Sequence, residues 1–215
     1  MNLQPNLFVV PPSGGRIALA LLFSLAVCTA LPAKEATPSC CEHKEDADAA
    51  TAESIYQLDA TWTTQLGKPM TLADLKGRPV LITMGYATCK FACPRLATDL
   101  LGIEKKLTAE ERANLAVVFV SIDPERDTPE QIKSFFDQYK VDHQRWFGLR
   151  GDEDAILELS VALGIRYRKT TETDFAHSNI IALLSPTGEI VHRQEGLGTD
   201  PADLITALRK PLEKP

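Results

Sequence analysis

The stretch VLITMGYATCKFACP, residues 80–94, combines an apolar run, two cysteines and a proline. The run from Val80 to Met84 predicts a buried central strand. Pro94 suits the first turn of a helix, where its missing N–H would have no partner anyway, and leucines recur after it at roughly helical spacing. The stretch therefore predicts a strand that passes directly into a helix, with Cys89 and Cys93 at the junction.

The rest of the chain repeats this alternation of strand and helix. Apolar, β-prone runs at residues 115–122, 146–149, 179–184 and 189–193 predict strands, and residues 128–139, 152–163 and 200–209 predict helices. A short hairpin at residues 61–72 precedes them, with Gly67-Lys68-Pro69 in its turn. This order predicts an α/β, thioredoxin-like fold, in which helices flank a central mixed sheet and the hairpin forms an N-terminal extension.

Composition limits the classes of protein that fit. The chain has 215 residues, of which 44% are hydrophobic and 24% charged, so one folded domain with appendages is expected and a polytopic membrane protein is not. The formal net charge is -6 and no run of lysine or arginine is present. A nucleic-acid partner is therefore not expected, because binding a phosphate backbone requires clustered basic side chains.

The first 33 residues differ from the rest. Arg16 precedes a nearly uninterrupted apolar run, and the small residues Cys28 and Ala30 have the spacing of a signal-peptide cleavage site. The run is about 17 residues long, the lower limit for spanning a bilayer. Residues 1–33 are therefore either a signal peptide or an N-terminal membrane anchor. A third alternative, lipidation at Cys28, is disfavoured by the bulky Val27 before it.

A signal peptide and an N-terminal anchor both predict an exported protein. The protein would be periplasmic, or it would be anchored to the membrane and face the periplasm. Residues 34–54 are rich in Ala, Glu, Asp and Thr without apolar periodicity, which predicts an acidic disordered tether. Residues 55–215 form the predicted folded domain. Outside the cytoplasm thiols are not kept reduced by cytosolic pools, so the cysteines of this domain require an explanation.

Cys89 and Cys93 are candidates for metal binding or thiol chemistry. Residues four apart share a helix face at about 5–6 Å, so both sulfurs can meet one ion or form a disulfide. The start of a helix also favours thiolate, the form that binds metals and attacks disulfides. An inert structural disulfide is the alternative, but it would close too small a loop to constrain the unfolded chain much.

Three segments resemble the Sco/SenC family. Gly85-Tyr86-Ala87-Thr88-Cys89-x-x-x-Cys93-Pro94 is similar to its metal-binding loop, Val120-Ser121-Ile122-Asp123-Pro124-Glu125-Arg126-Asp127-Thr128 to its long signature, and Asp174-Phe175-Ala176-His177-Ser178 to its histidine segment. The resemblance implies a thioredoxin fold and copper bound by two cysteines and one histidine. It also implies assembly of the binuclear copper centre of cytochrome c oxidase, with the oxidase's copper-binding subunit or another cuproprotein as partner.

His177 is the third ligand that the resemblance implies. By itself it is ambiguous, since it lies 84 positions after Cys93 (177 less 93) and only the fold can bring the two together. Two thiolates suit Cu(I) and an imidazole allows Cu(II), whereas a zinc site would need a fourth ligand or a water. Lys90 and Phe91 replace the family's usual proline and aspartate, and Ala176 replaces an aspartate. These differences affect the expected identity of the docking partner more than the expected copper site.

Two functions remain open for this site. The first is a copper metallochaperone. The second is a thiol-disulfide oxidoreductase, in which Cys89 attacks and Cys93 resolves while the partner's copper-ligand cysteines are reduced. Thiol peroxidase activity is a weaker third, because it does not require His177.

Two other segments have open interpretations. Cys40, Cys41 and His43 in the tether form a candidate secondary Cu(I) site, or else are incidental. The charged loop of residues 123–127 is either a solvated turn or a docking element for the partner.

Overall fold

The computed structural model describes residues 54–210. The predicted signal or anchor, nearly all of the predicted tether and Cys40, Cys41 and His43 lie outside these residues. Ser54, which was assigned to the end of the tether, belongs to the folded part, because it is buried and its hydroxyl donates to the carbonyl of Thr187 at 2.5 Å. Within the described part of the chain, none of the helices has both the length and the apolar character needed to cross a bilayer.

Seven strands form one mixed sheet in the order β2-β1-β5-β4-β3-β8-β9. Strands β3, β4 and β5 run parallel, while β1, β8 and β9 pair antiparallel with their neighbours. The strands are β1 (Trp62–Thr64), β2 (Pro69–Met70), β3 (Val80–Gly85), β4 (Ala116–Ser121), β5 (Trp146–Arg150), β8 (Ile180–Leu184) and β9 (Ile190–Glu195). A second sheet consists only of β6 (Tyr167–Lys169) and β7 (Phe175–His177).

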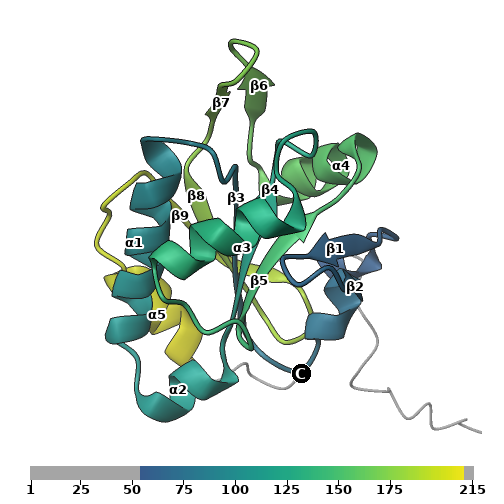
Figure 1. Cartoon of the computed structure of the whole chain (residues 1–215). Helices are drawn as coiled ribbons and strands as arrows, with labels where there is room; N and C mark the ends of the chain where they lie inside the picture. The colour runs from purple at the N-terminus through teal and green to yellow at the C-terminus, as the bar shows by residue number, and fades with distance from the viewer. Residues whose placement is uncertain (1–53, 211–215) are drawn as a thin grey trace, which may run out of the picture. The chain divides into compact units, whose positions relative to one another are not determined.

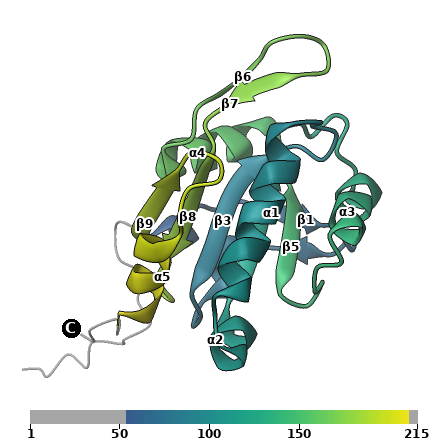
Figure 2. The same cartoon turned by 90° about the vertical axis from the view of Figure 1, so that its left-hand side faces the viewer.

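Five α-helices accompany the sheet: α1 (Ala92–Lys105), α2 (Ala109–Asn114), α3 (Pro129–Gln138), α4 (Glu153–Leu163) and α5 (Ala202–Arg209). Two short 3-10 helices, η1 (Ile55–Gln57) and η2 (Leu72–Leu75), lie near the start. Figure 1 shows the sheet nearly edge-on, and in Figure 2 α1 and α5 lie in front of the sheet with α4 behind it. This is the predicted central mixed sheet flanked by helices, so the predicted fold class is confirmed.

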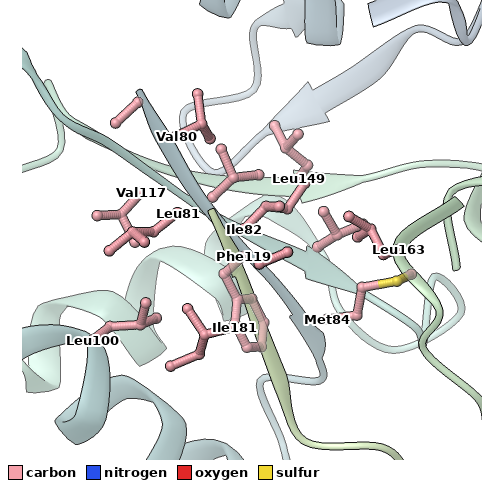
Figure 3. Packing of buried hydrophobic residues seen from close by; sticks show 14 of the residues in the cluster. Val80, Leu81, Ile82, Met84, Leu100, Val117, Phe119, Leu149, Leu163 and Ile181 are labelled. Atoms are coloured by element: carbon pink, nitrogen blue, oxygen red, sulfur yellow. The ribbon is translucent and has the colours of Figure 1, made fainter. Parts of the chain in front are cut away.

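The core is built on the three strands whose residues are all buried, β3, β4 and β8. On one face the ring of Phe119 of β4 contacts Phe135 and Phe136 of α3, and on the other Met84 lies near Leu163 of α4 (Figure 3). A strand buried on both faces must be mostly apolar, which is why these three strands are nearly continuous apolar runs in the sequence. The hydroxyls of the buried Thr83 and Ser121 are hydrogen-bonded, to the carbonyl of Ile180 and to Asp127.

Local sequence signals explain the helix boundaries. Asp152 accepts a hydrogen bond from Ala155 N–H at 2.8 Å at the start of α4. Gly164 ends the same helix with φ 71°, a left-handed conformation in which a side chain would be strained. Both ends of this helix were predicted correctly.

The predicted N-terminal hairpin is confirmed as β1 and β2, but it is more than an appendage, because β1 also pairs with β5 and so widens the central sheet. Besides the short 3-10 helices η1 and η2, the sequence prediction missed two features. The first is α2, although Thr108 and Glu111 form a reciprocal capping box at its start. The second is the β6–β7 hairpin, whose strands are short and contain no buried residue.

A matched pair of glycine substitutions tests this packing. A side chain at Gly148 of β5 would meet Ile132 and, at 3.2 Å, the ring of Phe136, both on α3, whereas one at Gly102 of α1 would meet nothing within 4 Å. We expect Gly148→Ala to lower the free energy of unfolding by about 1–3 kcal/mol in urea denaturation. Gly102→Ala should be neutral or stabilising by up to about 1 kcal/mol, because alanine is the better helix former. Equal stability of the two variants would contradict the packing of α3 on β5.

Candidate functional site

The site forms where β3 and β4 end side by side. These parallel strands are in register to their last residues, so Gly85 of β3 is opposite Ser121 of β4. The loop that contains Cys89 leaves β3 at this edge and leads into α1, which contains Cys93. The charged loop of residues 123–127 leaves β4 beside it. The carboxyl edge of parallel strands is where α/β folds commonly place their binding residues.

Cys89 does not lie on the helix, contrary to the sequence expectation that both cysteines share one helix face. It lies in a turn whose Cys89 N–H donates to the Tyr86 carbonyl at 3.2 Å, and α1 begins only at Ala92. The two cysteines are nevertheless brought together. Cys89 Sγ accepts the backbone N–H of Cys93 at 3.5 Å, one of the free N–H groups of the first helical turn.

Cys93 is the inner thiol. It is completely buried, while Cys89 is only half-buried, and neither is in a disulfide. Cys93 Sγ accepts the N–H of Tyr86 at 3.3 Å. Because Gly85 has no side chain, this sulfur can sit close to the end of β3: a β-carbon there would lie 2.8 Å from it.

His177 reaches the thiols from the end of β7, although it is 84 residues away from Cys93 in the chain. Its Nε2 lies 3.9 Å from Cys93 Sγ, and its Nδ1 lies 3.1 Å from the carbonyl of Ser178. A carbonyl can only accept, so this contact assigns the proton to Nδ1 and leaves the Nε2 lone pair facing the sulfur. That tautomer is the one in which Nε2 can bind a metal ion.

The pKa values of the two thiols are shifted in opposite directions. The hydrogen bond from the Cys93 thiol, supported by backbone N–H groups of Cys93 and Phe91, lowers the pKa of Cys89 to about 3. The same hydrogen bond to Cys89, together with burial, raises the pKa of Cys93. The pair therefore shares one proton, which stays on the buried sulfur, and exposes a thiolate at Cys89.

The three side chains meet the basic requirement for holding a soft metal ion. Metal–sulfur and metal–nitrogen bonds of about 2.3 and about 2.0 Å allow one ion to bridge atoms 3.9 Å apart, the separation of Cys93 Sγ and His177 Nε2. Across residues 54–210, however, no three His, Cys, Asp or Glu side chains are already arranged around a common metal position. Ion binding would have to displace the shared proton and draw Cys89 inward.

Asp127 is a site residue that the sequence analysis did not single out. It has no exposed surface, and its Oδ2 accepts from Ala87 N–H at 2.7 Å and from the Ser121 hydroxyl at 2.6 Å. Burial raises the pKa of this carboxyl. The side chain therefore ties the end of β4 to the loop just before Cys89.

This finding corrects one interpretation of the charged loop. A solvated turn is wrong, because Asp123 is also buried, with 1% exposed. No local pattern in the sequence identifies Asp127, because it lies six residues after Ser121, the last residue of β4, and only the fold shows that it is buried.

Tyr86 is a second residue that the sequence analysis left without a role. It is buried, its hydroxyl lies 3.4 Å from Phe175 N–H and 3.5 Å from Asp174 Oδ1, and its ring contacts His177 edge-on. Burial raises its pKa to about 12, so its hydroxyl stays protonated. Tyr86 thereby connects the cysteine loop with β7.

The residues that depart from the family pattern face solvent. Phe91 is 87% exposed between the two cysteines, and Lys90 and Ala176 are exposed as well. The side chains of these three residues take no part in the contacts among Cys89, Cys93 and His177, although the backbone of Phe91 contributes to the lowered pKa of Cys89.

The family model for SCO1/SenC matches residues 48–213 of this chain. A protein of Stutzerimonas stutzeri is 32% identical over 130 residues, which are 59% of this chain and 62% of the relative, so the match spans a little less than two thirds of that protein. The SCO1 protein homolog of Bacillus subtilis is 28% identical over 148 residues, or 67% of this chain and 76% of the relative.

Solved structures give the same result. Bradyrhizobium japonicum ScoI, determined with copper bound, matches with a TM-score of 0.59 and 27% identity, over 69% of this chain and 94% of that one. Arabidopsis thaliana ScoI with copper bound gives a TM-score of 0.61 and 25% identity, over 69% and 92%. BsSco, described as a cytochrome c oxidase assembly protein with a disulfide switch, gives 0.62 and 27%, over 71% and 91%.

The lowered pKa of Cys89 predicts a flat pH profile of thiol reactivity. In the native protein, alkylation of Cys89 by iodoacetamide should proceed at nearly the same rate from about pH 5 to about pH 8, because the thiolate persists below the ordinary thiol pKa of about 8.5. In Cys93→Ala the thiol that donates to Cys89 is gone, so the pKa of Cys89 should return towards its ordinary value. The alkylation rate should then fall about tenfold for each unit by which the pH is lowered over that range. A steep profile in the native protein would contradict the shared proton.

Proposed function

Because this chain belongs to the SCO1/SenC family, we propose that it is a copper metallochaperone, which binds copper through Cys89, Cys93 and His177 and delivers it to another protein. The observation that carries the proposal is the convergence of two thiols and the Nε2 of a histidine at the sheet edge, from segments 84 residues apart. Relatives that were solved with copper bound support the choice of metal.

The donor set suits copper in both oxidation states. Two thiolates are soft ligands that bind Cu(I) well, and an imidazole nitrogen supports Cu(II). Zinc fits less well, because a structural zinc site has four protein ligands, and the described residues offer no fourth His, Cys, Asp or Glu grouped with these three. Cys89 is half-buried and is the more accessible of the two thiols, so an acceptor's ligand could reach the ion there and exchange with it.

We propose the copper-binding subunit of cytochrome c oxidase, or another exported cuproprotein, as the acceptor. The printed description of BsSco as a member of a family of cytochrome c oxidase assembly proteins supports this choice. We also propose that the protein is exported and is periplasmic or anchored to the membrane by its N-terminus, which rests on the apolar run in residues 1–33.

A thiol-disulfide oxidoreductase is the second candidate, and the asymmetry of the two thiols favours it. The Cys89 thiolate would attack a disulfide between the partner's copper-ligand cysteines and form a mixed disulfide. Cys93 would then lose its proton and attack Cys89. This step releases the partner as a dithiol and leaves a Cys89–Cys93 disulfide that an external dithiol must reduce.

Copper titration of single variants tests the proposed ligands. A reduced, soluble form starting at about residue 48 should bind one copper, and Cys89→Ser or Cys93→Ser should abolish tight binding because too few soft ligands remain. His177→Ala should weaken Cu(II) binding more than Cu(I), since two thiolates can hold Cu(I) without help. The measurement is equilibrium competition with a chelator of known affinity.

The matched controls lie outside the site. His192→Ala removes a histidine of β9, and changing both Cys40 and Cys41 to Ser in the full chain removes the tether thiols. Both should leave the affinity of the main site unchanged. Copper retained by Cys89→Ser and Cys93→Ser alike would refute the ligand assignment, and a tenfold loss in the tether variant would show that the tether supplies ligands.

A further inference from the structure

The β6–β7 hairpin, called the histidine hairpin below, carries His177 but does not belong to the central sheet. Figure 1 shows it projecting beyond the edge where β3 and β4 end, and Figure 2 shows the same projection from the side. Its strands pair only with each other, with Tyr167 opposite His177 and Lys169 opposite Phe175. Its placement over the cysteines therefore depends on side-chain contacts rather than on a continuous sheet.

The charged loop after β4 supplies the contact at the far end of the hairpin. The guanidinium of Arg126 donates to the backbone carbonyl of Thr173, in the turn of the hairpin. The same guanidinium forms an ion pair at 2.5 Å with Asp123, whose side chain is 2% exposed. A buried carboxylate thus fixes the position of Arg126 on the folded body, and Arg126 in turn holds the hairpin.

The other two attachments are weaker. Lys169 and Glu125 approach to 3.3 Å, but their side chains are 43% and 68% exposed, and such surface pairs contribute little. The Tyr86 hydroxyl contacts Asp174 and the Phe175 N–H at 3.5 and 3.4 Å, which is long for hydrogen bonds. Arg126 is only 29% exposed and makes charge-assisted contacts on both sides, so it is the strongest of these three polar links. The Tyr86 ring adds apolar contacts with Phe175 and His177.

We propose that Arg126 is a positioning residue for the copper site, which locks the histidine hairpin to the domain so that His177 stays against Cys93. The effect of Arg126 on copper binding rests on the proposed function, whereas its attachment of the hairpin to the domain does not. Thr173 lies in the turn, two residues before β7 begins at Phe175, and His177 is the last residue of β7, which pairs in fixed register with β6. Movement of the turn away from Arg126 would therefore swing His177 away from the thiols.

The structural part is tested in the metal-free protein by hydrogen–deuterium exchange of the amides in residues 166–178. In Arg126→Gln, exchange in this segment should rise about tenfold, the size expected for one charge-assisted hydrogen bond, while amides of β3 and β4 keep their protection. The matched control is Arg209→Gln. Arg209 also pairs with a carboxylate, Glu111 at 2.8 Å, and donates to a backbone carbonyl, Lys106 at 3.2 Å, at the opposite end of the fold.

A second variant keeps the test decisive if Arg126→Gln fails to fold. Arg126→Lys retains a positive charge for Asp123 but lacks the planar, multi-donor guanidinium, so its hairpin should exchange at a rate between those of the native protein and Arg126→Gln. Unchanged exchange in residues 166–178 in the variants that fold would overturn the proposal. Loss of protection throughout the central sheet would also overturn it, because Arg126 would then serve folding rather than the hairpin.

Copper spectroscopy of the same variants tests the consequence for the site. Arg126→Gln should lose about tenfold in Cu(II) affinity and show a weaker imidazole nitrogen signal in electron paramagnetic resonance, while Cu(I) affinity stays near the native value. Arg209→Gln should resemble the native protein in both. Native Cu(II) affinity and spectrum in Arg126→Gln would overturn the copper part. If the native protein binds no copper, the proposed function fails while the exchange result still decides the role of Arg126.

Discussion

The parallel pairing of β3 with β4 is the constraint on which the site depends. Because Gly85 and Ser121 are opposite each other, the cysteine loop and the charged loop start from the same edge of the sheet. The buried Asp127 carboxylate then joins them, with one oxygen accepting from Ala87 N–H and from the Ser121 hydroxyl. Leaving a buried carboxylate without these donors would be costly, so the two loops are held in one relative position.

The chemistry of the pair follows from this placement. Cys93 is held inside by α1 and the end of β3, while Cys89 lies in the turn outside the helix. Their shared proton therefore stays on the buried sulfur, and the thiolate faces the side from which a partner would come. An accessible thiolate serves either ligand exchange on copper or attack on a disulfide, which explains why one arrangement supports both proposed functions.

Much of the fold could be predicted from the sequence because its signals are local. The buried strands are nearly continuous apolar runs, and Asp152 and Gly164 mark the two ends of α4. The histidine hairpin could not be predicted in this way, because its strands are three residues each and none of these residues is buried. Its position is set by contacts across long sequence separations, such as Arg126 with Thr173, that no local pattern encodes.

In the candidate site, too, features with a local sequence signal could be predicted and features set by long-range contacts could not. Cys89 and Cys93 were found from their spacing and position, but the expectation of a shared helix face was wrong because the chain turns at Cys89 before α1 begins. Their meeting with His177 came from the family resemblance alone. Asp127 and Tyr86 gave no sequence signal of their own, since their roles lie in hydrogen bonds to residues 40 and 89 positions away.

X-ray absorption at the copper edge tests the central claim most directly, because it reports the atoms bound to the metal. For the Cu(II)-loaded domain the account predicts two sulfur neighbours at about 2.3 Å and an imidazole nitrogen at about 2.0 Å, distances close to those of zinc. The outer-shell scattering of the imidazole ring should disappear in His177→Ala. A native spectrum with only oxygen and nitrogen neighbours, or an imidazole signal that survives in His177→Ala, would contradict the assignment of Cys89, Cys93 and His177 as the copper ligands.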